Sequence, residues 1–189
     1  MKKHNLLPLA AACVLALASC GNSNSGKTDS TNQANQVNEQ KGTVDPEVSD
    51  FMVKAADAGM AEVELGNLAQ QNGSSQRVKD FASMMIRDHS AANEELKGIA
   101  STKNVTLPAT LGDKHQKHFE AMRKMTGADF DKHYMEMMAK DHQEVISMFE
   151  DASKNSTDAE AKAFAEKTLP ILKTHLDSAT AINESLKKQ

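Results

Sequence analysis

The chain has 189 residues, a formal net charge of -4, and 39% hydrophobic, 25% charged and 4% aromatic residues. This length is enough for one domain, and the low aromatic content argues against a β-sandwich or a barrel. Without the first 19 residues the chain keeps 20 basic and 26 acidic residues, so its net charge is -6 and we expect no nucleic-acid partner.

Residues 1–19 have the features of a lipoprotein signal peptide. Lys2 and Lys3 precede an apolar run that is too short to span a bilayer, and the run ends in Leu-Ala-Ser-Cys-Gly at residues 17–21. This ending resembles a bacterial lipobox, in which the cysteine sulfur receives a diacylglycerol. We therefore expect Cys20 to be the lipidated first residue of the mature chain. An ordinary signal peptide with an incidental cysteine is the alternative.

Residues 20–45 are expected to form a disordered polar tether. The stretch from Gly21 to about Val44 contains no Leu, Ile, Met or aromatic residue, so it has too little apolar surface to fold. A lipid on Cys20 would anchor the protein to a membrane without crossing it. By resemblance to enterobacterial sorting, Gly21 favours the outer membrane, with the domain facing the periplasm.

Residues 46–189 are expected to form one helical domain. Asp45-Pro46 is a typical helix start and Asn72-Gly73 a typical helix end. A capping-box spacing between Thr157 and Glu160 predicts the start of the last helix. The predicted long helices cover residues 46–72, 75–103, 126–154 and 157 to nearly the end.

The connection between the second and third long helices is unusually long. It covers residues 104–125, and part of it, residues 114–125, is expected to be a short helix. A simple up-down bundle does not need so long a connection, whereas a bundle with one crossover does. The sequence thus predicts an all-α fold, a four-helix bundle with one long crossover connection between helices two and three.

One strongly polar residue interrupts the apolar seam of each predicted long helix. The seams repeat every three or four residues, and the interruptions are Glu62, His89, His142 and His175. In the crossover topology their depths along the bundle differ by roughly 7 Å at 1.5 Å per residue, so they can share a layer. Such buried polar residues need partners.

Short motifs around these four positions resemble a known family. They are Ala-Glu-Val-Glu-Leu at residues 61–65, Met-Ile-Arg-Asp-His at 85–89, Asp-His at 141–142, and Leu-Pro at 169–170 followed by His175. In their order and spacing they resemble the exported ferritin-like family catalogued as domain of unknown function 4142. The resemblance covers residues 47 to about 187. It implies a ferritin-like four-helix bundle, often in envelope lipoproteins, and no established activity.

One Glu and three His side chains that converge inside a bundle are a candidate transition-metal site. Neutral imidazole and carboxylate suit iron, zinc, manganese or copper, and the candidate ligands are Glu62, His89, His142 and His175. A two-metal oxidase site would need a Glu three residues before each His. Those positions hold Ile86, Ala139 and Leu172, so only a mononuclear site is expected.

Three further residues are expected to orient the metal ligands. Asp88 and Asp141 directly precede His89 and His142, but they are turned about 100° around the helix. Tyr134 lies on the same seam as His142. These residues are better placed as hydrogen-bond partners than as ligands.

Other interpretations stay open at this point. The histidines could be neutral, hydrogen-bonded to Glu62, Tyr134 or the aspartates, and serve only to fix the helix register of a stress-related structural or interaction module of the envelope. Charging such histidines could also sense pH. Thioether and imidazole pairs such as Met138 with His142 suit copper(I), although methionine at helical spacing usually fills a core.

The remaining polar motifs carry little chemistry. His115 and His118 are one turn apart on a helix rich in Lys and Gln, and we expect both to be solvated. No nucleophile has a recognisable partner motif and no Gly-rich loop could cradle a phosphate, so the sequence does not indicate an enzyme. It also names no protein partner.

Overall fold

The computed structural model describes residues 29–188, and all regular structure within that range is helical. This confirms the predicted all-α class. The signal peptide and Cys20 lie outside the described residues, so their predicted roles stay predictions. The six helices are α1 (Ser30–Lys41), α2 (Pro46–Asn72), α3 (Gln76–Thr102), α4 (Asp113–Met122), α5 (Gly127–Asn155) and α6 (Ala159–Lys187).

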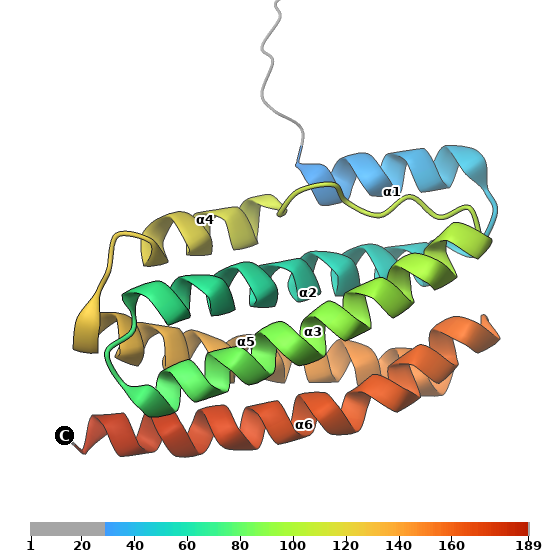
Figure 1. The fold of residues 1–189 in the computed structure, drawn as a ribbon. Coiled ribbons are helices and arrows are strands. Elements are labelled where there is room, and N and C mark those ends of the chain that lie inside the picture. The colour runs from blue at the N-terminus through green and yellow to red at the C-terminus, as the bar shows by residue number, and fades with distance from the viewer. Residues whose placement is uncertain (1–28, 189) are drawn as a thin grey trace, which may run out of the picture.

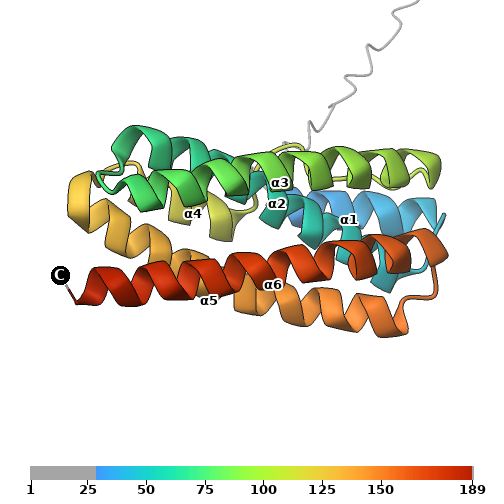
Figure 2. The same cartoon turned by 60° about the horizontal axis from the view of Figure 1, so that its bottom comes forward.

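The four long helices α2, α3, α5 and α6 lie alongside one another (Figures 1 and 2). Helix α2 packs closely against α3, and α5 packs closely against α6, each pair being joined by a short turn. Helices α3 and α5 run in the same direction, so the connection between them, residues 103–126, returns along the whole length of the molecule (Figure 1). Helix α4 forms part of this return.

Side-chain caps explain where the long helices begin. The Asp45 side chain accepts a hydrogen bond from the Glu47 backbone N–H at 3.0 Å, and Pro46 occupies the first turn of α2, as expected. The cap of helix α6 lies one residue later than predicted. Asp158, rather than Thr157, is its cap, because the Asp158 carboxylate accepts from the backbone N–H groups of Glu160 and Ala161.

Helix α1 corrects the prediction of a disordered tether over residues 20–45. Residues 30–41 are helical, begin at the Asp29 cap and end at Gly42, whose φ of +58° is in the left-handed region. Asn38 is buried and pairs with both backbone groups of Thr106, at 2.7 and 2.9 Å. The helix is held by polar side chains that satisfy the backbone of the long connection, a source of order that apolar content does not reveal.

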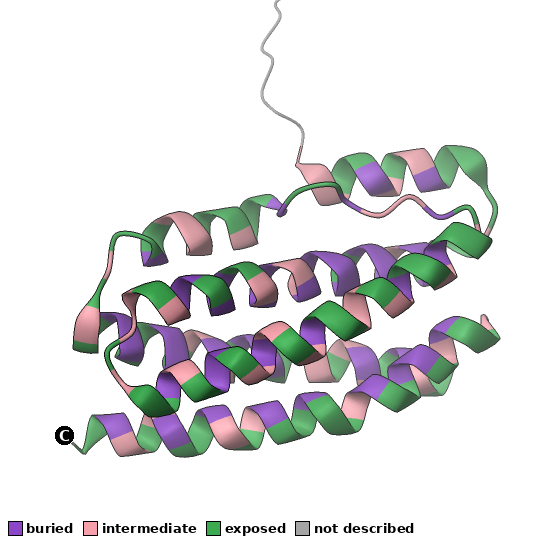
Figure 3. Cartoon of the chain, viewed as in Figure 1, coloured by how far each residue is buried: buried purple, intermediate pink, exposed green. Residues whose placement is uncertain are grey.

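The hydrophobic core consists of two clusters at the two ends of the long helices. The first cluster includes Leu65 and Met85, and the second includes Phe51, Phe149 and other residues from all four long helices. In the second cluster, the rings of Phe51 and Phe149 meet edge to face with centroids 5.1 Å apart. Buried residues line the sides on which the long helices face one another (Figure 3).

No helix within residues 29–188 combines the length and the apolar character needed to cross a membrane.

Candidate metal centre

Three buried histidines meet between the two apolar clusters. His89, His142 and His175 lie near the middle of α3, α5 and α6, and their ring centroids are 5.3 to 5.7 Å apart. Their exposed fractions are 7%, 1% and 1%. One nitrogen from each ring lies within 4.8 Å of the other two, which is close enough for all three to hold one metal ion. The structure therefore brings together three of the four predicted ligands.

Hydrogen bonds fix the orientation of two of the three rings. His142 Nδ1 lies 2.9 Å from the Met138 carbonyl oxygen, and His175 Nε2 lies 3.0 Å from a carboxylate oxygen of Asp88. Both oxygens only accept hydrogen bonds, so the proton must sit on His142 Nδ1 and on His175 Nε2. The other nitrogen of each ring then carries a lone pair.

The remaining nitrogens of the cluster have no protein partner. His89 Nε2, His142 Nε2 and His175 Nδ1 are buried and make no hydrogen bond to the described residues. A buried polar atom without a partner is costly, at about 1 to 3 kcal/mol each. Because the three rings are close enough to share one metal ion, these unpaired nitrogens are candidate ligand atoms for a cation.

Burial keeps the three imidazoles neutral. It lowers the pKa of His89 to about 3 and that of His142 to about 4, and the neighbouring histidines lower both further because two imidazolium charges would repel each other. Burial also lowers the pKa of His175, although Asp88 opposes this shift. Neutral imidazole is the form that coordinates metal ions.

Glu62, the fourth predicted ligand, lies beside this group rather than inside it. Its Oε1 is 3.6 Å from His142 Nδ1, the nitrogen that is bonded to the Met138 carbonyl, and its Oε2 is buried without a partner. Burial, with the charge of Asp141, raises the pKa of Glu62 to about 8. At neutral pH the side chain is therefore mostly protonated.

Of the three residues expected to orient the ligands, only Asp88 contacts one. It bonds to His175 as described, and Arg87 lies 2.8 Å from its carboxylate. Partial burial acts to raise the pKa of Asp88, but the bonds from Arg87 and His175 outweigh it, so the pKa is lowered. Asp141 instead lies 3.6 Å from the Lys114 ammonium. The Tyr134 hydroxyl is buried with no partner, and burial raises its pKa well above the ordinary value.

Two features of this region were not foreseen from the sequence. The first is the Met138 carbonyl, which holds His142 from one turn earlier in α5; any helical histidine can make this contact, so the sequence gives no specific signal for it. Met138 itself packs in the first apolar cluster, as a core residue does. The second concerns His115, which was expected to be solvated but is only 13% exposed.

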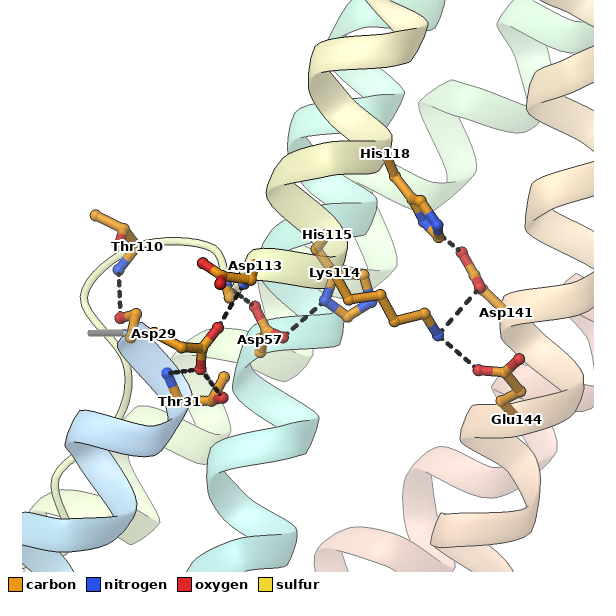
Figure 4. Close-up of polar contacts among 12 residues, drawn as sticks. Asp29, Thr31, Asp57, Thr110, Asp113, Lys114, His115, His118, Asp141 and Glu144 are labelled. Carbon is orange, nitrogen blue, oxygen red and sulfur yellow. Dashed lines mark hydrogen bonds and ion pairs between the residues drawn. The ribbon is translucent and has the colours of Figure 1, made fainter. Parts of the chain in front are cut away.

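His115 is part of a separate polar cluster that attaches α4 to α2 (Figure 4). Its Nδ1 lies 2.7 Å from Asp57 Oδ2, and the other oxygen of Asp57 accepts the Gly112 backbone N–H at 2.7 Å. His118, one turn further along α4, lies 3.8 Å from Asp141 and is about one-third exposed. The expectation of two solvated histidines is therefore wrong for His115, because Asp57 comes to it from another helix.

A family model described as domain of unknown function (DUF4142) matches residues 32–182, which is most of the chain. The chain belongs to this family. The match confirms the resemblance noted in the sequence, and it shows that the DUF4142 region includes all three histidines of the cluster. No curated protein and no solved structure matches this DUF4142 chain.

Proposed function

We propose that this DUF4142 protein binds one transition-metal ion between His89, His142 and His175. The observation that carries the proposal is the convergence of three neutral imidazoles, each of which has one buried, unpaired nitrogen. A divalent ion would satisfy all three lone pairs at once. Without it, each unpaired nitrogen bears the cost of burial with no compensating bond.

The donor set favours a borderline metal ion. Three imidazoles suit zinc, iron, copper and, less well, manganese. Three protein ligands leave a fourth coordination position for a small molecule, as in catalytic rather than structural zinc sites. Glu62, 3.6 Å from His142, is close enough to reach such a ligand or, after a side-chain rotation, the ion itself.

The surrounding architecture fits a ferritin-like four-helix bundle. The directions of α2, α3, α5 and α6, with the long return between α3 and α5, support this topology (Figure 1). Metal sites in such bundles are built from side chains on facing helices near their middle, which is where the histidines lie. We place the bundle in the cell envelope, anchored through a lipid on Cys20 and facing the periplasm, where it would store or buffer the metal or protect against its redox chemistry.

Elemental analysis of the full-length protein tests the metal site. The protein would be purified without chelator or histidine tag, alongside His89→Ala, His142→Ala and the control His133→Ala, which removes an exposed histidine of α5. We expect near-stoichiometric metal in the wild type and the control, and its loss in both cluster variants. Wild-type protein that is metal-free and gains no thermal stability from zinc, iron, manganese or copper would overturn the proposal.

A purely structural role for the histidines is the second candidate. Two rings are held by hydrogen bonds to Met138 and Asp88, as a device that fixes helix register also requires. This role predicts that His142→Leu gives a folded protein with unchanged or higher stability, because a leucine leaves no unpaired nitrogen. Loss of a metal-dependent stabilisation in the same variant would contradict it.

A further inference from the structure

A small cavity lies directly against the histidine cluster. Its volume is about 20 Å³, and its polar lining residues are Glu62, His89 and His142, together with Asn93 and Thr168. Most of the remaining wall is apolar, with Ala58 of α2 and Ala92 of α3 among the lining residues. The cavity is therefore mostly apolar, and three of its five polar lining residues belong to the proposed metal site or lie beside it.

The volume limits what the cavity can hold. About 10 to 15 Å³ is enough for one water molecule, so 20 Å³ accepts a molecule of one or two heavy atoms and excludes sugars, peptides and nucleotides. The apolar wall disfavours a charged occupant, because an ion would lose its hydration without gaining partners there. Apolar cavities bind small apolar molecules readily.

The polar residues at the proposed metal site can contact such a molecule at two points. An ion held by three imidazoles would keep an open coordination position, and His89 and His142 belong both to the proposed site and to the cavity wall. Glu62 Oε2, which is buried and unpaired, lies on the same wall and is available for a hydrogen bond to the outer atom of a ligand.

We infer that the cavity binds one neutral diatomic molecule, of the class of dioxygen and nitric oxide, at the open position of the metal ion. The inference rests on the proposed metal site for the ligand's attachment, but the cavity itself is a property of the protein. A bound water that such a molecule cannot displace is the competing occupant, and the experiment below separates the two.

The first part of the test uses metal-free full-length protein and dissolved dioxygen as a paramagnetic probe in nuclear magnetic resonance. The methyl groups of Ala58 and Ala92 should relax faster under dioxygen than that of Ala139, which is also partly buried but packs against the first core cluster. The variant Ala92→Leu fills the cavity and should remove the effect at Ala58. The exposed neighbour Ala91→Leu is the matched control and should keep it.

The second part uses iron(II)-loaded protein and nitric oxide without oxygen. We expect the electron paramagnetic resonance signal of an iron nitrosyl, with affinity for nitric oxide at least tenfold weaker in Ala92→Leu at unchanged iron content. Circular dichroism of both alanine variants verifies that they fold. Equal nitric oxide affinity in Ala92→Leu and the wild type would overturn the inference.

The two parts distinguish failure of the inference from failure of the proposed function. Protein that binds metal but shows no dioxygen effect at Ala58 and Ala92 has no accessible cavity, and this result overturns the inference alone. Protein that shows the dioxygen effect but binds no metal overturns the metal site, and with it the attachment of the ligand, while the cavity persists as a gas-accessible space.

Discussion

Two polar clusters of this protein contain histidines, and His115 in the first differs from the histidines of the second in how its ring is paired. In the α4 cluster, His115 and Asp57 are 2.7 Å apart, and Gly112 satisfies the second oxygen of Asp57 (Figure 4). In the cluster between α3, α5 and α6, each of the three histidines, including His142, has one buried nitrogen without a partner. Both histidines are largely buried, so burial alone does not identify a ligand.

His118 Nδ1, on α4, is also buried and unpaired, but no second unpaired histidine nitrogen of the described residues is grouped with it, so the candidate ligands are marked by unpaired nitrogens on rings that converge. A histidine that meets a carboxylate from another helix joins two elements and has no free donor on that side. A histidine with one hydrogen-bonded nitrogen and one buried, unpaired nitrogen is oriented to bind a ligand that is not part of the protein. The predictions below test this difference, from the largest expected effect to the smallest.

The largest effect expected is metal-dependent stability. Metal at 100 times its dissociation constant should raise the free energy of unfolding of the wild type by about 2.7 kcal/mol. His142→Ala should abolish this gain, whereas His115→Ala should keep it although it loosens α4. Urea unfolding with and without metal measures both. A gain that is lost equally in the two variants would remove the distinction between the clusters.

Breaking the α4 cluster should cost stability without affecting the metal. Asp57→Ala leaves the Gly112 N–H and the His115 ring unpaired, which should lower the free energy of unfolding by about 2 kcal/mol. The metal content should not change. Metal content measured together with urea unfolding checks this, and a variant with wild-type stability would show that the pair contributes nothing.

Weakening the support of one ligand should have an intermediate effect. Asp88→Asn removes the charge that holds the His175 ring, and losses of about 10- to 100-fold in metal affinity are typical of such changes. Competition with a chromogenic chelator measures the affinity. The control is Asp80→Asn, which alters an exposed carboxylate on the same helix. Equal affinities for the two variants would mean that Asp88 does not position the ring.

The metal-free protein should be most stable near pH 6.5. In the folded protein His89 and His142 have pKa values of about 3 and 4, so below pH 6.5 they stay neutral while the same histidines of the unfolded chain take up protons. The free energy of unfolding therefore decreases as the pH is lowered below 6.5. Between pH 4.5 and 8 folded Glu62 holds a proton that the unfolded chain lacks. Its contribution to the free energy of unfolding therefore decreases as the pH rises, which cancels the opposite effect of one of the two histidines. The net loss below 6.5 should be roughly 1 kcal/mol per pH unit.

Urea unfolding across this pH range checks the expectation, and His89→Gln should make the acid limb shallower. Saturating metal should steepen the dependence, because protons then compete with the ion for the imidazoles. A metal-free stability that is flat from pH 6.5 down to 4.5 would show that the cluster histidines can be charged in the folded state.

The sequence predicted the long helices well because their ends carry local signals. Asp45-Pro46 and Asn72-Gly73 mark both ends of α2, and the structure has the helix between them. The convergence of His89, His142 and His175 followed from helical periodicity combined with the crossover direction of the chain. Both depend only on spacing along regular helices.

The features that the sequence did not reveal depend on contacts between distant segments. Asn38 orders α1 through the backbone of Thr106, a contact that an argument from apolar content does not count. His115 is paired because Asp57, on another helix, faces it. Glu62 lies beside His142 Nδ1 rather than within the group of three histidines. Its position depends on side-chain rotation, which residue spacing does not fix.

X-ray absorption spectroscopy at the edge of the bound metal tests the central claim most directly. The account expects three imidazole nitrogens around the ion, at about 2.0 to 2.1 Å if it is zinc, with the multiple scattering that histidine rings produce. The imidazole contribution should disappear in His142→Ala and persist in His115→Ala. A first coordination sphere made of oxygen alone, or one that the His142 variant leaves unchanged, would contradict the account.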